Sequence, residues 1–269
     1  MNKVVAPKRA RKIILLAFIF LAVGGLSVTI SWWRADSLTI RKLPDFSAIQ
    51  NVKMKKKVFF DFLRPIVQAE NRKVKVKRQQ MLAMRDKLDH GKMLTEPERA
   101  WLLQLADKYH VEMDDINDKH AWMLLRRRVD AVPFRLALAQ AAIESSWGTS
   151  RFARQGLNLF GQWCFTPDCG IVPQKRRTGM THEVATYASI NESVASYIRS
   201  INRVQMYKSL RKLRHSIKKR GKPPTAVELA KGLVGYSQRG EEYVKKIRSI
   251  IRKNYDLMSG NLSVGNNRM

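Results

Sequence analysis

Residues 140–153 read QAAIESSWGTSRFA, and this stretch decides how the rest of the chain is interpreted. Its one acid, Glu144, follows the run PFRLALAQAAI, which is too apolar for a solvated helix. The C-terminal end of a helix disfavours negative charge, and apolar neighbours desolvate a carboxylate. Both effects raise the pKa of a carboxyl group, as a general acid near neutral pH requires. The alternative is a structural carboxylate paired with Arg151 or Arg154.

The N-terminus indicates export. The chain has 269 residues and a formal charge of +29, which favours an anionic partner such as nucleic acid, anionic lipid or bacterial cell wall. A basic cytoplasmic tail, residues 1–12, precedes an uncharged run, residues 13–33, that is long enough to cross a bilayer. This favours an uncleaved transmembrane anchor in the inner membrane, with the rest of the chain in the periplasm. A cleaved signal peptide is the alternative. Export conflicts with nucleic acid as the partner.

Two cysteines lie close together in WCFTPDCG, where Pro167, Asp168 and Gly170 favour a turn. In an oxidising compartment, Cys164 and Cys169 at this spacing predict a local disulfide. Two free buried thiols are the alternative. Two cysteines are too few for a zinc site, so we expect neither a metal nor a cofactor.

Changes in composition along the chain predict an α+β fold that is mostly helical. We expect a linker over residues 34–52, a basic helical extension over residues 53–130, a catalytic domain over residues 131–257 and a flexible tail over residues 258–269. The extension should hold a helix from Lys53, a second over residues 72–88, a third with a capping box at Thr95 and Glu98, and a fourth over residues 122–129. Its basic helices either lie on anionic lipid or present a solvated face.

Within the expected catalytic domain, two short runs predict a small β-hairpin lobe: NLFGQWCF and EVATYAS. Helices are expected again from Asn191 as N-cap, over residues 205–220, from Thr225, and over residues 241–255.

The block ALAQAAIESSWGTSRFA, followed by NLFGQWCF, resembles the active-site signature of the peptidoglycan glucosaminidases, family 73 of the glycoside hydrolases. The similarity includes the Bax-type bacterial branch and extends over residues 43–254, through VQMYKSLRKLR and LVGYSQRGEEYVKKI. It implies a lysozyme-like domain that cleaves the β-1,4 bond after N-acetylglucosamine in the glycan strands of peptidoglycan.

The resemblance implies Glu144 as the general acid and Tyr207 as a tyrosine that orients substrate or water. Glu183 precedes a strand that would flank the cleft, so it is the candidate second carboxylate. The alternatives are an exposed hairpin-edge position for Glu183 and water activation by the substrate's N-acetyl group. Trp163 is interpreted as either sugar-facing or part of the core. The candidate substrate-binding residues are Trp147, Asn158, Phe160, Gly161, Gln162, Tyr187 and Tyr236.

Three positions depart from the family pattern: Ile143, Ser146 and Leu157. They remove no reacting group, but a bulkier Ile143 and Ser146 would reshape the cleft. Two other functions stay open: a lytic transglycosylase, which needs a single acid, and a non-catalytic wall-binding scaffold. Amide cleavage lacks the zinc-ligand cluster it would need, because His182 and His215 are isolated in the sequence.

Overall fold

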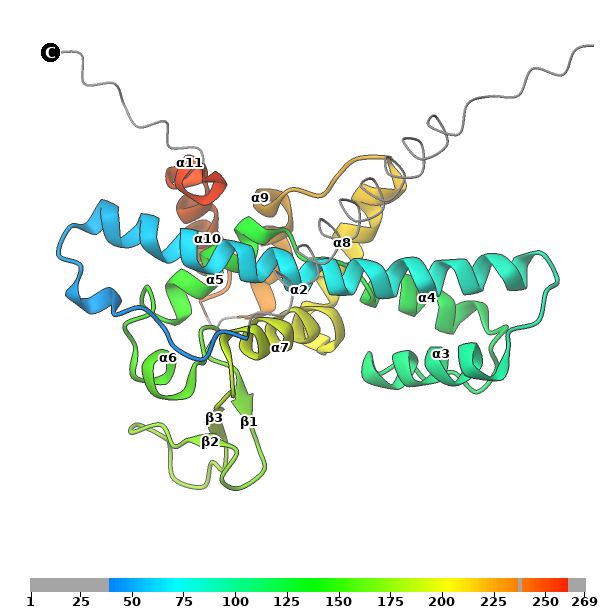
Figure 1. Cartoon of the computed structure of the whole chain (residues 1–269), viewed down its shortest axis with the longest axis horizontal. Helices are drawn as coiled ribbons and strands as arrows, with labels where there is room; N and C mark the ends of the chain where they lie inside the picture. Colours follow the sequence, from blue (N-terminus) through cyan, green and yellow to red (C-terminus); the bar gives the residue numbers. More distant parts are fainter. Residues whose placement is uncertain (1–38, 237–238, 261–269) are drawn as a thin grey trace, which may run out of the picture. The chain divides into compact units, whose positions relative to one another are not determined.

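The computed structural model describes residues 39–236 and 239–260, and Figure 1 shows their arrangement. The chain divides into two compact units at Thr39 and Ile40, so nearly all described residues belong to the second unit. The expected membrane segment, residues 13–33, lies outside the described residues, as does most of the expected tail. Within the described residues, no helix combines the length and the apolar character that crossing a bilayer requires.

The described part of the chain is mostly helical with a small antiparallel sheet, which confirms the α+β class. The α-helices are α2 (Val52–Asp89), α3 (Glu96–Lys108), α4 (Lys119–Arg128), α5 (Phe134–Glu144), α6 (Arg151–Gly156), α7 (Ile190–Arg203), α8 (Lys208–Lys219), α9 (Ala226–Leu229), α10 (Glu241–Lys253) and α11 (Tyr255–Ser259). The 3₁₀ helices are η1 (Phe46–Ala48), η2 (Gln205–Tyr207) and η3 (Ala230–Tyr236), and the strands are β1 (Trp163–Cys164), β2 (Gly170–Ile171) and β3 (Glu183–Ala185).

Helix α2 is one continuous helix of 38 residues, so the prediction of two separate helices is wrong. Asn51 caps it by accepting a hydrogen bond from the Met54 backbone N–H. Pro65 lies inside the helix but is exposed and does not end it. Figure 1 shows α3 and α4 beside the C-terminal half of α2, whereas α5 and α11 accompany its other half.

Two hydrophobic clusters share α2. The larger one contains the apolar faces of α5, α7, α8 and α10. The first half of α2 contributes five apolar residues to it: Phe59, Phe60, Leu63, Ile66 and Val67. The smaller cluster joins Met81 and Met84 to Trp122 of α4 and to the apolar residues of α3. The larger core, which supports α5, therefore includes residues that precede the predicted domain start at residue 131.

The starts of α3 and α7 differ in how well the sequence predicts them. The capping box of Thr95 and Glu98 is present and confirms the predicted start of α3. Helix α7 instead begins after Ser189, whose hydroxyl accepts a hydrogen bond from the Glu192 N–H, so the predicted N-cap at Asn191 is wrong. The side chain of Asn191 accepts a hydrogen bond from the Ile40 N–H, which ties the start of this unit to α7.

The segment that leads into α5 is fixed by buried polar contacts. Asn71 of α2 exchanges two hydrogen bonds with the Val132 backbone, at 2.8 Å and 2.9 Å. The buried carboxylate of Asp130 pairs with Lys218 of α8 at 2.6 Å, and Arg214 donates to the Ala131 carbonyl. A buried carboxylate requires such partners, and these contacts tie the segment before α5 to α2 and to α8.

The β-lobe is a three-stranded antiparallel sheet in the order β1-β3-β2, which corrects the simpler hairpin expected from the sequence. Trp163 of β1 pairs with Val184 of the central strand, and Cys164 pairs with Glu183. On the other side, Gly170 of β2 pairs with Ala185. The strands are only two or three residues long, and the lobe packs against α6.

Candidate active site

Glu144 is the last residue of α5, and its side chain is half-buried. Desolvation raises the pKa of this carboxyl group, while hydrogen bonds from Tyr243 and Tyr236 and the charge of Lys246 partly oppose the rise. The net shift is upward, in the direction that the sequence predicts. Arg151, one expected partner, donates instead to the Val172 carbonyl. Glu144 therefore has the electrostatic character of a proton donor.

A chain of three hydrogen bonds leads to one oxygen of Glu144. The Tyr197 hydroxyl donates to Gln140 Oε1 at 2.7 Å, and Gln140 Nε2 donates to the Tyr243 oxygen at 3.1 Å. The Tyr243 hydroxyl then donates to Glu144 Oε1 at 2.8 Å. Gln140 and Glu144 are four residues apart on α5 and therefore share a face.

The direction of this chain indicates which oxygen of Glu144 accepts the hydrogen bond of Tyr243. Because the Tyr243 oxygen accepts from Gln140, its single hydrogen is available for Glu144 Oε1. Oε1 is thus an acceptor in this arrangement, which favours Oε2 as the oxygen that carries a proton. A Cβ atom built on Gly161 would lie 3.8 Å from Oε2, so the loop at Gly161 borders this oxygen.

The side chain of Asn158 orders the loop at Gly161 through hydrogen bonds to the backbone. Its side chain is only 1% exposed, and its amide donates to the carbonyls of Gln162 and Ala185. Its Oδ1 accepts hydrogen bonds from the N–H groups of Phe160 and Gln162. Gly161 has a φ of +62°, a conformation that glycine adopts without steric cost. Asn158 therefore orders the backbone that passes Glu144.

Aromatic rings line the same region. Phe160 stacks on Tyr197 with ring centroids 4.0 Å apart, and the ring centroids of Tyr236 and Tyr243 are 5.0 Å apart. Tyr207, the expected active-site tyrosine, is buried and stacks on Tyr236 at 5.8 Å. The structure thus brings Tyr207 close to the site through Tyr236, and its catalytic role stays a prediction.

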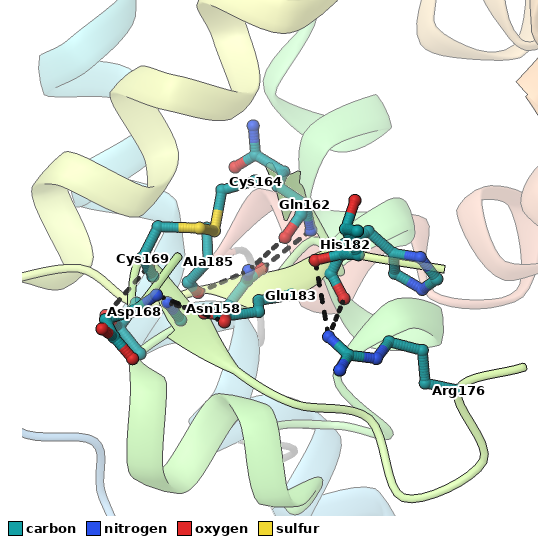
Figure 2. Close-up of a disulfide and its surroundings, with 12 residues drawn as sticks. Asn158, Gln162, Cys164, Asp168, Cys169, Arg176, His182, Glu183 and Ala185 are labelled. Atoms are coloured by element: carbon teal, nitrogen blue, oxygen red, sulfur yellow. Dashed lines mark hydrogen bonds between the residues drawn. A yellow bond between two sulfur atoms is a disulfide. The ribbon is translucent and has the colours of Figure 1, made fainter. Parts of the chain in front are cut away.

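Glu183 contacts the turn that the disulfide closes, as Figure 2 shows. Its carboxylate accepts hydrogen bonds from the N–H groups of Gly170 at 2.7 Å and Asp168 at 3.3 Å. Cys164, Cys169 and Glu183 lie close enough together to be considered as metal ligands. The two cysteines are joined in a disulfide, however, so their sulfur atoms are not available to bind a metal ion. These contacts give Glu183 a structural role, and its role as second carboxylate stays a prediction.

Comparisons with known proteins show which family the chain belongs to. The sequence profile of the family described as mannosyl-glycoprotein endo-beta-N-acetylglucosaminidase matches residues 119–256, which is 138 of the 269 residues. The chain belongs to the glucosaminidase family. Protein bax of Escherichia coli (strain K12) is 29% identical over 227 residues, covering 84% of this chain and 80% of that protein. No solved structure matches.

The predicted resemblance to Bax-type glucosaminidases is thereby confirmed. The structure separates the predicted substrate-binding residues into two groups. Phe160, Gly161 and Tyr236 lie around Glu144. In the second group, Gln162 bonds to Tyr187 and to two serines of α7, and the Trp147 ring packs edge-on against Phe59 and Phe60. With Asn158, this second group makes contacts that shape the glucosaminidase fold.

Three residues near Glu144 are missing from the sequence-based set of site residues: Gln140, Tyr197 and Tyr243. Gln140 had a usable signal, because it lies one helical turn before the acid in a run of small apolar residues. Tyr243 belongs to the segment LVGYSQRGEEYVKKI, which resembles the family, but no local pattern shows that its hydroxyl reaches α5.

Proposed function

We propose that the chain hydrolyses the β-1,4 bond after N-acetylglucosamine in peptidoglycan glycan strands, with Glu144 as the general acid. The observation that carries this proposal is the carboxyl group of Glu144: its pKa is raised by burial, and Tyr243 holds Oε1 while Oε2 borders the Gly161 loop. Membership of the glucosaminidase family supports the type of bond.

In the proposed reaction, the proton on Glu144 Oε2 passes to the glycosidic oxygen as the bond to the anomeric carbon breaks. Positive charge develops on the sugar ring, and Glu144 becomes a carboxylate that Tyr243 stabilises through its hydrogen bond to Oε1. A water molecule then adds its oxygen to the anomeric carbon and passes a proton to the Glu144 carboxylate, which restores the acid. The new reducing end therefore carries N-acetylglucosamine.

The group that assists the attacking water is the second part of the proposal. Glu183 would have to leave its hydrogen bonds to Gly170 and Asp168 in order to reach a water molecule. Strand neighbours also point to opposite faces, so Glu183 points away from the face of His182 and Val184. These contacts favour assistance by the substrate's own N-acetyl group, with Glu183 as the alternative.

The decisive experiment compares wild type with Glu144→Gln on purified sacculi, followed by mass spectrometry of the products. We expect the variant to lose activity by a factor of about 10²–10⁴ while it keeps its circular dichroism spectrum. Reducing N-acetylglucosamine ends support the proposal, whereas anhydro-muramic ends would identify a lytic transglycosylase. Equal activity of wild type and Glu144→Gln would refute the role of Glu144, and binding without cleavage by wild type would indicate a scaffold.

Glu183→Gln is the companion variant, because it keeps an oxygen that can accept from the Gly170 N–H. If the N-acetyl group of the substrate assists the attacking water, the activity of Glu183→Gln should stay within about threefold of wild type. A loss as large as that of Glu144→Gln would assign Glu183 as the base.

We also propose that the catalytic part faces the periplasm, anchored in the inner membrane through residues 13–33. The support is the basic flank before this uncharged run. A topology reporter fused after Tyr255 should be active only in the periplasm, and cytoplasmic activity would contradict this location.

A further inference from the structure

Trp163 is an exposed aromatic side chain beside the catalytic region. It lies in β1, an edge strand of the lobe, and 55% of its surface is exposed. Its indole stacks on the imidazole of His182, with centroids 3.9 Å apart and an angle of 16° between the planes. Tryptophan side chains are enriched at binding surfaces, because they combine a large apolar ring with a polar N–H group.

The lobe holds this indole rigidly. Trp163 pairs with Val184, and His182 is two residues before Val184, so both rings lie on the same face of the sheet. The next residue, Cys164, is cross-linked to Cys169, which limits the movement of β1. The indole therefore has one face covered by His182 and keeps its open surface on the other side.

His182 supports the indole of Trp163 with the face of its imidazole ring. The residue is only 8% exposed, and its backbone carbonyl accepts a hydrogen bond from Arg176, which Figure 2 shows. Within the described part of the chain, its buried Nδ1 has no hydrogen-bond partner. The imidazole is thus held by packing against Trp163 and by its backbone.

The position of Trp163 relative to Glu144 follows from the short connection between them. Gly161 borders Glu144 Oε2, and Trp163 follows Gly161 by two residues. Two extended residues span at most about 7 Å, so the backbone of Trp163 lies close to the loop that borders Glu144 Oε2. A sugar ring adjacent to the bond at Glu144 would come within reach of Trp163.

We propose that Trp163 is a stacking site for the pyranose ring of an N-acetylhexosamine in the glycan strand, next to the bond that is cleaved, and that His182 is its positioning residue. The C–H groups on one face of a pyranose ring are apolar and match an indole surface. This inference rests on the proposed function, because it takes the glycan as the substrate.

Binding without turnover tests the site directly. The full chain, solubilised in detergent and carrying Glu144→Gln, is titrated calorimetrically with the β-1,4-linked tetramer of N-acetylglucosamine. Adding Trp163→Ala should weaken binding about tenfold, which corresponds to about 1.4 kcal/mol, whereas Trp163→Phe should stay within about threefold. Tyr255→Ala is the matched control, since Tyr255 is 53% exposed and stacks on Arg135 at the opposite end of α5.

Steady-state kinetics on sacculi separates a binding role from a structural one. In the chain that keeps Glu144, Trp163→Ala should raise KM about tenfold and leave kcat nearly unchanged. His182→Ala should raise KM in the same direction, and His182→Phe, which keeps a ring behind the indole, should restore most of the affinity.

The outcomes separate the two proposals. If the Glu144→Gln chain binds the tetramer and Trp163→Ala binds equally well, the stacking site is refuted and the proposed function stands. If the Glu144→Gln chain does not bind the tetramer and wild type does not cleave sacculi, both proposals are refuted.

Discussion

At the scale of single residues, Tyr243 controls the ionisation of the proposed acid. Its hydroxyl donates to Glu144 Oε1 and so favours the carboxylate, which lowers the pKa that burial raises. Tyr243→Phe removes this hydrogen bond, so the pKa of Glu144 should rise further. Glu144 would then stay protonated to higher pH, and the alkaline limb of the kcat/KM profile should shift upward. The lost contact in the transition state should lower kcat about tenfold.

Two further variants serve as graded controls for this pH profile. Gln140→Leu frees the Tyr243 hydroxyl from its fixed orientation and should shift the limb by a smaller amount in the same direction. Tyr197→Phe removes the outermost hydrogen bond and should shift it least. A Tyr243→Phe profile that moves to lower pH would contradict the assigned direction of the chain.

How far the sequence predicts the site differs between these residues. Glu144 was predictable because a lone acid at the end of an apolar helix has a local pattern. Tyr243 is 99 residues away from it, and the contact depends on how α10 packs against α5. Asn158 was placed in the right loop, but its four hydrogen bonds to the backbone are visible only in the folded chain.

At the scale of elements, α2 differs most from the prediction. Its first and second halves have different compositions, which suggested two helices, but the same helix continues from one half into the other. Pro65 lacks an N–H for the helix and is exposed, so it contributes little packing.

Pro65→Ala should therefore raise the free energy of unfolding by about 1–3 kcal/mol, because alanine restores a helical hydrogen bond without strain. Urea denaturation followed by circular dichroism measures this change through the transition midpoint. Gln68→Ala, at an exposed position of the same helix, is the control and should change stability by less than about 0.5 kcal/mol. An unchanged or lower midpoint for Pro65→Ala would show that the proline is accommodated without cost.

The β-lobe was predictable in place and cross-link but not in topology. The cysteine spacing and the turn residues predicted the disulfide. The order β1-β3-β2 was not predictable, because β2 is only two residues long and a strand this short carries no periodic pattern.

At the scale of the whole molecule, the residues that match the family do not contain the complete core. The matched part begins at residue 119, whereas Phe59, Phe60, Leu63, Ile66 and Val67 of α2 are buried in the same cluster as α5. Such side chains stabilise a fold by about 1.5–3 kcal/mol each, and together by about 10 kcal/mol, which is comparable to the total stability of a domain.

We therefore expect a chain of residues 119–269 to be largely unfolded, whereas residues 40–269 should fold. Far-ultraviolet circular dichroism and thermal unfolding of both chains check this expectation. A cooperative transition of the shorter chain near that of the longer one would show that α2 is dispensable. The sequence suggested a boundary near residue 131 because the lysines of α2 are obvious in the sequence, whereas the burial of its apolar face is not.

Because α2 is one continuous helix, it fixes the angle about its axis between the larger and the smaller hydrophobic cluster. A helix advances by about 100° and 1.5 Å per residue, so inserting one residue between Arg78 and Met81 would turn the second hydrophobic cluster by that angle about the helix axis. Met81 and Met84 would keep their neighbours in the second cluster, but Arg78 could no longer donate to the carbonyls of Arg126 and Val129. Helix α4 would also lose its packing against α7 and α8. The number of residues in α2 is therefore constrained as strictly as the identity of its buried side chains.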